Sequence, residues 1–178
     1  MDLFQAISER RSIRKFKPEA VEEEKLQQLF TAAQLAPSWA NTQVTRFYLI
    51  SDPEVKNQVA DCIAPGNPSF TASHDAPHLM VVAAKTGISG FKKGEASTVK
   101  GDTWYMFDAG LACQNLTLTA HALGLGTVHV GVVDTDQVHR ILNLPPEIDV
   151  IELIPIGYRD QEPKMPRRID LDELVTRI

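Results

Sequence analysis

The stretch TWYMFDAGLACQNLTLTAHALGLGTVHVGVV, residues 103–133, contains a helix, a glycine stop and a strand in that order. Apolar side chains recur at helical spacing and predict one long helix from about Thr103 to Leu123. The side chains that define this apolar face are Trp104, Phe107, Leu111 and Leu118. The pair Gly124 and Gly126 is expected to end the helix, because glycine accepts the left-handed backbone found at helix ends. A second interpretation is also open: without a Cβ atom, this backbone could approach a planar ligand. A strand is expected over residues 127–133.

Shorter patterns on both sides of this stretch predict the remaining elements. A short helix is expected after Asp2, with Leu3, Phe4 and Ile7 on its apolar side, and another after Asp134 that ends before Pro145. Further helices are expected at residues 22–36 and 53–63, and buried strands at 47–50, 78–84 and 150–158. Residues 85–101 show no periodicity and are expected to form a mobile surface segment. This order of helices and strands predicts a single layered α+β domain over residues 1–178. The polar tail from Arg159 onward cannot fold on itself, so we expect it to lie along another surface, such as a partner subunit.

Composition excludes several classes of protein. With 178 residues, 43% apolar and 23% charged, the chain can bury a core and does not resemble a disordered segment. No apolar run reaches the roughly 20 residues of a membrane-spanning helix. The opening residues lack the features of a signal peptide, and Cys62 and Cys113 provide no disulfide framework, so a cytoplasmic protein is expected. A net charge of −5 argues against nucleic-acid binding by bulk charge.

The positive charges of this acidic chain gather near its two ends. One basic cluster contains Arg10, Arg11, Arg14, Lys15 and Lys17, and a second contains Lys164, Arg167 and Arg168. Two interpretations are open at this point. The clusters could form a local anion site, or they could be two solvated basic stretches.

Several familiar constellations of catalytic residues are absent. The sequence has no G-x-S-x-G elbow and no phosphate loop of the G-x-x-x-x-G-K-[ST] type. The G-x-G at Gly124 follows a helix and precedes a strand, which is the reverse of a dinucleotide-binding fingerprint. The histidines and cysteines do not have the spacing of metal ligands, so no metal site is expected.

The segment Ala36–Gln43 joins a helix to a buried strand and places several hydrogen-bonding side chains around Trp39. It could be a ligand cradle with a flat apolar wall, or Trp39 could be a core residue in an ordinary loop. Asp108 lies in an apolar helix, where a carboxylate is costly unless it is hydrogen-bonded. We expect Asp108 to brace a neighbouring segment by a hydrogen bond to its backbone, and Gln114 and Asn115 to brace structure in a similar way.

Six pieces of sequence occur in an order that is characteristic of one family. They are Arg10–Phe16 after a short opening helix; Pro37–Gln43 with Arg46-Phe47; Asp108–Gly110 with Gln114–Leu116; Gly124–Thr127; Ile156–Tyr158; and the ending Glu162–Lys164, Arg167-Arg168 and Leu171–Leu174. Together they span nearly the whole chain, which therefore resembles the nitroreductase family of flavin enzymes. Two features depart from the usual pattern: Val44-Thr45 stand where many relatives have Pro-Trp, and residues 85–101 are short and rich in lysine.

The resemblance implies a nitroreductase-like α+β fold with a central mixed, mainly antiparallel sheet flanked by helices. It also implies an intertwined homodimer with FMN at the interface and the tail, residues 159–178, over the partner subunit. Flavin phosphate, ribityl chain and pyrimidine edge would be held by Arg10, Arg11, Ser12, Arg14, Lys164 and Arg168. From the partner chain, Pro37, Ser38, Trp39 and Asn41 would pack along the isoalloxazine. Backbone N–H groups of Leu125, Gly126 and Thr127 would donate to the flavin, with no catalytic side chain, because the flavin carries the chemistry.

The activity implied by the resemblance is that of an FMN-dependent oxidoreductase. Hydride would pass from NADH or NADPH through the flavin to a nitroaromatic, a quinone or a similar small acceptor. The same fold could serve as an oxygen-dependent flavin oxidase or a flavin-consuming enzyme, or as a flavin-storage module without turnover. A nucleic-acid binder that uses the basic clusters is the alternative from another class, and it would carry no chromophore.

Overall fold

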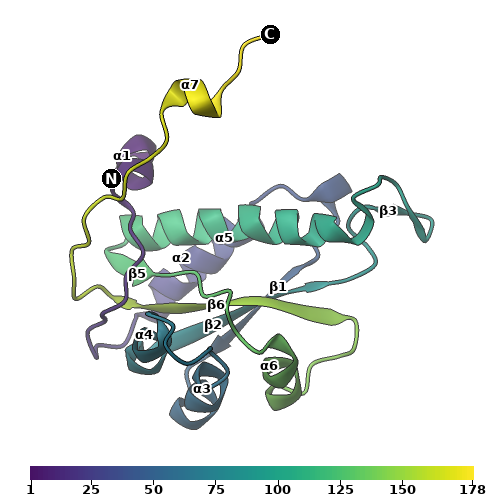
Figure 1. Ribbon diagram of the computed structural model, residues 1–178. Coiled ribbons are helices and arrows are strands. Elements are labelled where there is room, and N and C mark those ends of the chain that lie inside the picture. The colour runs from purple at the N-terminus through teal and green to yellow at the C-terminus, as the bar shows by residue number, and fades with distance from the viewer.

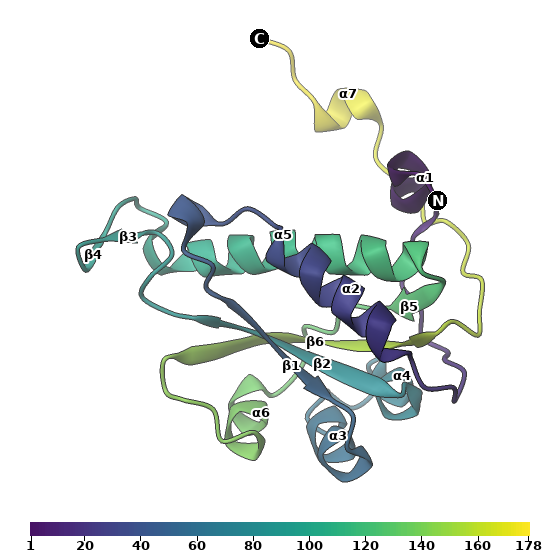
Figure 2. The ribbon, with the colours of Figure 1, turned by 180° about the vertical axis from the view of Figure 1, so that it is seen from behind.

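A four-stranded antiparallel sheet separates two layers of helices in the computed structural model, which describes residues 1–178 (Figure 1). The strand order is β1 (Thr45–Ile50), β2 (His78–Lys85), β6 (Ile148–Tyr158) and β5 (Leu125–Thr127). One face is covered by α2 (Glu23–Gln34) and α5 (Trp104–Ala122), and the other by α3 (Pro53–Ala60), α4 (Phe70–Asp75) and α6 (Thr135–Ile141) (Figures 1 and 2). The expected α+β class is confirmed.

The central strand β2 explains why two separate cores form. Side chains alternate between the faces of a strand, so Leu79 and Val81 pack toward α3 and α6, whereas Met80 and Val82 pack toward α2 and α5. All four are fully buried. A strand buried on both faces appears in the sequence as the continuous apolar run from which it was predicted.

The N-terminal segment after α1 (Leu3–Glu9) completes one end of the sheet. Ser12 forms a parallel bridge with Thr127, and Phe16 forms an antiparallel bridge with Arg159. Backbone hydrogen bonds hold this segment in place, from Ile13 N to Thr127 O and from Lys17 N to Tyr158 O, both at 2.9 Å. All strand pairs of the sheet are antiparallel, so the expected mixed sheet is corrected to an antiparallel one with a single parallel bridge at its edge.

The tail after β6 leaves the body of the molecule. It passes α1, forms the single turn α7 (Leu171–Leu174) and ends in open space beyond it (Figures 1 and 2). Large apolar side chains on both terminal helices are exposed, among them Phe4, which is 82% exposed, Leu171 and Leu174. Within a single chain, nothing packs over these side chains.

Two predictions are corrected by the structure, and one helix was not predicted. The strand expected at residues 127–133 was wrong, because β5 covers only Leu125–Thr127 and the chain then makes isolated bridges, including Val130 to Leu153, on its way to α6. Helix α4 was missed because its six residues are too few to show a periodicity. Residues 85–101 are not patternless: they include a hairpin of β3 (Phe91–Lys92) and β4 (Glu95–Ala96).

The predicted apolar face of α5 is also corrected. The buried side chains are mostly small, including Ala109, Ala112 and Cys113, whereas Phe107 is 58% exposed. Because this helix is apolar on all sides, spacing alone could not show which side faces the sheet. No helix of the structure has the length and apolarity to cross a bilayer, and no group of three or more His, Cys, Asp or Glu side chains could hold a metal ion.

Candidate functional site

The two basic clusters of the sequence line one pocket of about 330 Å³, called here the cation pocket. Its lining residues are Arg10, Arg11, Ser12, Arg14, Pro163, Lys164, Pro166 and Arg168. The sheet brings these segments together, since the bridge from Phe16 to Arg159 and the hydrogen bond from Asp160 N to Lys15 O set the start of the tail beside residues 10–16. All six basic or hydroxyl residues predicted to hold the flavin phosphate and its neighbours therefore lie around one space.

The electrostatics of the cation pocket favour an anion. No carboxylate lines it, and none of its five cationic side chains takes part in an ion pair. Burial and then the neighbouring Arg11 and Arg168 lower the pKa of Arg10 from its ordinary value. Like charges gathered without a counter-ion repel one another, and an anion in the pocket would relieve that repulsion.

Hydrogen bonds inside the protein orient two of these arginines. Arg14 donates through Nε to the hydroxyl of Ser69 at 3.2 Å, and Arg11 donates through Nη1 to the carbonyl of Ser8 at 2.7 Å. Ser69 lies just before α4 and was not predicted as a site residue, because its link to Arg14 spans 55 positions of sequence. A guanidinium held by one N–H keeps others free to bind a ligand.

The Leu125–Thr127 strand lies beside the cation pocket through the Ser12–Thr127 bridge. The two glycines here have separate functions. Gly124 has a φ of +80°, the left-handed backbone expected after a helix. At Gly126 a Cβ atom would lie 2.7 Å from Ile13 Cβ, so the absence of a side chain lets the N-terminal segment pack against β5.

Loop 36–43 forms a second candidate region at the start of α5. The Trp39 ring lies 4.7 Å from the Trp104 ring, and Phe107 packs edge-on to Trp104 at 5.6 Å. These aromatic side chains line a mostly apolar pocket of about 380 Å³, called here the aromatic pocket, together with Pro37, Ser38, Asp108 and Leu111. Trp39 is half-buried and forms a pocket wall, so its interpretation as a core residue was wrong.

The backbone of loop 36–43 is strained. Ala40, Asn41 and Gln43 all have positive φ values, of 43°, 56° and 50°, although none is glycine. Such conformations cost free energy and concentrate at ligand-binding sites, where the surrounding structure holds them in place. The hydroxyl of Thr42 is buried in the same loop without a hydrogen-bond partner.

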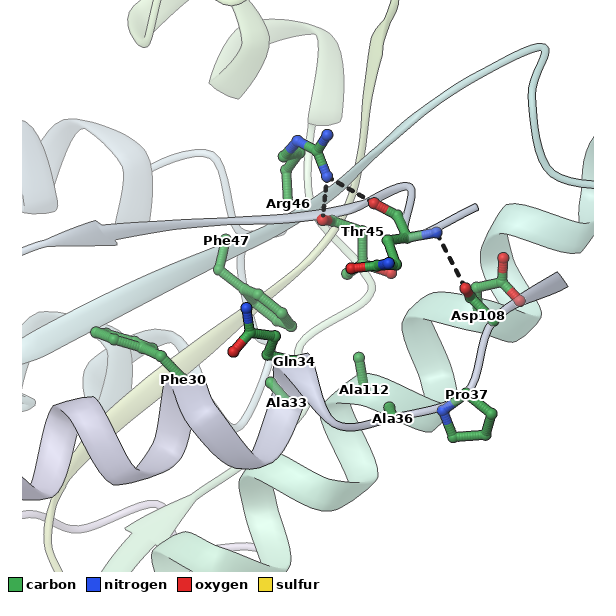
Figure 3. A pocket seen from close by; sticks show the side chains of 12 residues that line it. Phe30, Ala33, Gln34, Ala36, Pro37, Thr45, Arg46, Phe47, Asp108 and Ala112 are labelled. Carbon is green, nitrogen blue, oxygen red and sulfur yellow. Dashed lines mark hydrogen bonds between the residues drawn. The ribbon is translucent and has the colours of Figure 1, made fainter. Parts of the chain in front are cut away.

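A further pocket of about 240 Å³ lies on the other side of this loop, between α2, β1 and α5 (Figure 3). Figure 3 shows Phe30 and Phe47 at one end of it and Pro37 and Asp108 at the other. Arg46 donates to the carbonyl groups of Gln43 and Thr45, both at 2.8 Å, and so fixes the end of the loop. Pro37, Ser38 and Asp108 border both pockets, so the loop is a thin wall between them.

The expected bracing side chains are confirmed in two of three cases. Asp108 accepts a hydrogen bond from the backbone N–H of Trp39 at 2.8 Å, and Asn115 donates to the carbonyl of Ala32 at 3.1 Å. Gln114 is exposed and its side chain makes no such bond, so its predicted role was wrong. Both confirmed contacts tie α5 to the segment around α2.

Within one chain, the two predicted halves of the site do not meet. The aromatic pocket lies near Asp108, whereas Arg11 and His121 line one pocket beside the cation pocket. At a rise of 1.5 Å per residue, Asp108 and His121 are about 20 Å apart along α5. Figure 2 shows this separation, with loop 36–43 and the N-terminal segment at opposite ends of α5.

Comparisons with known proteins agree with this geometry. The family model described as "Nitroreductase family" matches residues 7–158. A "Putative NADH dehydrogenase/NAD(P)H nitroreductase" of Methanothermobacter thermautotrophicus is 28% identical, covering 98% of this chain and 86% of its own. An "FMN reductase [NAD(P)H]" of Bacillus subtilis is 28% identical, covering 93% of this chain and 70% of its own. The solved structure of an FMN-dependent nitroreductase from Clostridium difficile R20291 has a TM-score of 0.79 at 29% identity, covering 99% of this chain and 98% of its own.

Proposed function

We propose a function from one established premise, that the chain belongs to the nitroreductase family. It is an FMN-dependent oxidoreductase that takes electrons from NADH or NADPH. Relatives named as FMN reductase, NADPH-flavin oxidoreductase and FMN-dependent nitroreductase support both the cofactor and the reductant. The cation pocket, which gathers five unpaired positive side chains from the two ends of the chain, is the observation on this molecule that carries the proposal.

The residues of the cation pocket fit the phosphate of FMN. Arg10, Arg14, Lys164 and Arg168 would bind its oxygens with charge-assisted hydrogen bonds, and Ser12 would donate from its hydroxyl. Arg11 would stand alongside. The backbone N–H groups of Leu125, Gly126 and Thr127 would donate toward the ring system and favour its reduced form.

The ring-binding residues would come from a second copy of the chain. Pro37, Ser38, Trp39 and Asn41 lie at the far end of α5 from the cation pocket of their own chain, so one chain alone cannot complete the site. The exposed apolar side chains of α1, of the outer face of α5 and of the tail support a homodimer, because exposed apolar surface of this extent marks a protein interface. The tail, residues 159–178, would wrap the partner subunit.

The chemistry of the site then divides between the cofactor and the protein. FMN, when bound, supplies hydride transfer at a flat ring that accepts one planar reactant at a time. The protein anchors the phosphate, supports the ring with backbone donors, and provides the aromatic walls Trp39, Trp104 and Phe107 against which planar molecules pack. An apolar aromatic slot suits a nitroaromatic, a quinone or a similar planar acceptor.

The decisive experiment is an absorbance spectrum of the purified protein, followed by anaerobic addition of NADH and NADPH. We expect a bound flavin that bleaches with reductant and recovers its colour with a quinone or a nitroaromatic. The variant Arg10→Ala should lose flavin while remaining folded, with Arg140→Ala, an exposed arginine on α6, as the matched control. A colourless protein that cannot be reconstituted with FMN, or a flavin that no nicotinamide reduces, would overturn the proposal.

A further inference from the structure

The two carboxylate oxygens of Asp108 accept hydrogen bonds from two different loops. Asp108 is buried, with only 2% of its surface exposed. Oδ1 accepts from the backbone N–H of Trp39 at 2.8 Å, and Oδ2 accepts from the hydroxyl of Ser89 at 2.7 Å. Ser89 is fully buried. The hydrogen bonds that satisfy this buried carboxylate thus come from two segments that are far apart in the sequence.

Ser89 belongs to residues 86–103, called here the hairpin segment, which is held together as a unit. Ser97 N donates to the carbonyl of Gly90 at 2.8 Å, and Gly87 N donates to Asp102 at 3.0 Å. Gly90 lies directly against Trp104, since a Cβ atom on it would be 2.7 Å from the indole ring. The hairpin segment is therefore packed on the start of α5 rather than free.

A second link joins the same two loops through Trp104. Its indole Nε1 donates to Thr98 in the hairpin segment at 3.0 Å, and its ring packs on Trp39 at 4.7 Å. Trp104 and Asp108 are one helical turn apart on α5, so both links start from the same rigid face. Loop 36–43 and the hairpin segment thus meet on two adjacent side chains.

We propose that Asp108 is a positioning residue that holds the aromatic wall of loop 36–43 and the hairpin segment in one fixed relation. A displacement of the hairpin segment then also displaces Trp39, and the width of the aromatic pocket depends on both loops together. Acceptor recognition is the step that this coupling controls, because the pocket walls and not the cation pocket would change. The role in acceptor recognition rests on the proposed function, whereas the coupling itself does not.

The coupling can be tested without flavin. The chain has two tryptophans, so a Trp104→Phe background leaves Trp39 as the sole reporter and leaves Asp108 as the remaining link. In that background, Ser89→Ala should shift the Trp39 emission and increase tryptic cleavage at Lys92, Lys93 and Lys100 about tenfold, since a lost bond to a buried charge makes opening that much more frequent. Ser97→Ala is the matched control, because that serine is exposed and its hydroxyl has no partner.

Two outcomes would overturn the coupling. One is faster cleavage of the hairpin segment in Ser89→Ala with an unchanged Trp39 emission, which would show two independent contacts. The other is a Ser97→Ala variant that behaves like Ser89→Ala. Asp108→Asn keeps a carbonyl for Trp39 N and an amide for Ser89, so it should retain the native emission, whereas Asp108→Ala should lose it.

The kinetic arm tests the role in recognition. In the otherwise native holoenzyme, Ser89→Ala should raise the acceptor KM severalfold and leave the affinity for FMN unchanged, because the cation pocket is not altered. An unchanged acceptor KM, or an equal loss of FMN affinity, would contradict a role of Asp108 in acceptor recognition. A protein that binds no flavin would contradict the proposed function. The emission and cleavage measurements would still test whether Asp108 couples the two loops.

Discussion

Gly126 packs against Ile13 so closely that a Cβ atom on the glycine would lie 2.7 Å from Ile13 Cβ. Ile13 follows Ser12 and precedes Arg14, two residues of the cation pocket. The variant Gly126→Ala should therefore push the N-terminal segment off β5. We expect a loss of about 1 to 3 kcal/mol in the free energy of unfolding, typical of overpacking, together with weaker FMN binding.

Denaturant unfolding and FMN titration measure the two effects. Gly110→Ala is a suitable control, because a Cβ at that glycine meets nothing within 4 Å in the chain. If Gly126→Ala binds FMN as the unmodified protein does, the contact with Ile13 does not position the cation pocket.

The tail contributes both charge and apolar surface, and two truncations separate these contributions. Removal of residues 160–178 takes away Lys164 and Arg168, so both flavin content and dimerisation should fall. Removal of residues 171–178 alone keeps the cation pocket and should weaken the dimer more than it weakens FMN binding. Size-exclusion chromatography with light scattering, alongside flavin absorbance, checks the two expectations.

Tyr105 donates a hydrogen bond to Asp149 at 2.7 Å, and burial together with this carboxylate raises the pKa of Tyr105 from 10.0 to about 12. The pKa is higher in the folded state, so the stabilisation is complete below pH 10 and is lost as the pH rises toward 12. We expect Tyr105→Phe to lower stability at neutral pH and to reduce the loss of stability between pH 10 and pH 12. An alkaline titration of tyrosinate absorbance that finds no tyrosine near 12 would contradict the assignment.

The hydrogen bond from Asn115 to the carbonyl of Ala32 joins α5 to α2. Asn115→Ala should lower the free energy of unfolding by about 1 to 2 kcal/mol, because it leaves a half-buried carbonyl without its partner. Gln28→Ala, at an exposed position of α2, should change it by less than about 0.5 kcal/mol. Equal effects for the two variants would show that the bond contributes nothing.

Signals confined to a short stretch were readable from the sequence. Asp52 and Pro53 predicted the start of α3, and Asp52 accepts hydrogen bonds from the N–H groups of Glu54 and Val55. The continuous apolar run of β2 predicted a strand buried on both faces. These features depend on neighbours in the chain, which is why pattern alone was sufficient.

Features that depend on distant partners were beyond the sequence. The short β5 is defined by pairing with β6, and the buried face of α5 is defined by what packs on it, since its apolar side chains lie all round. Ser89 and Trp39 reach Asp108 across 19 and 69 positions of chain. The two basic clusters could be seen in the sequence, but only the bridges at Ser12 and Phe16 show how they come to share a pocket.

The cation pocket also has a consequence for biosynthesis. Its walls come from residues 10–14 and 163–168, so the pocket cannot form until both of these segments have left the ribosome. Cofactor loading must then follow synthesis of residues 163–168, and fragments that end before residue 163 would accumulate without prosthetic group. Supplying riboflavin during expression would therefore not load such fragments with cofactor.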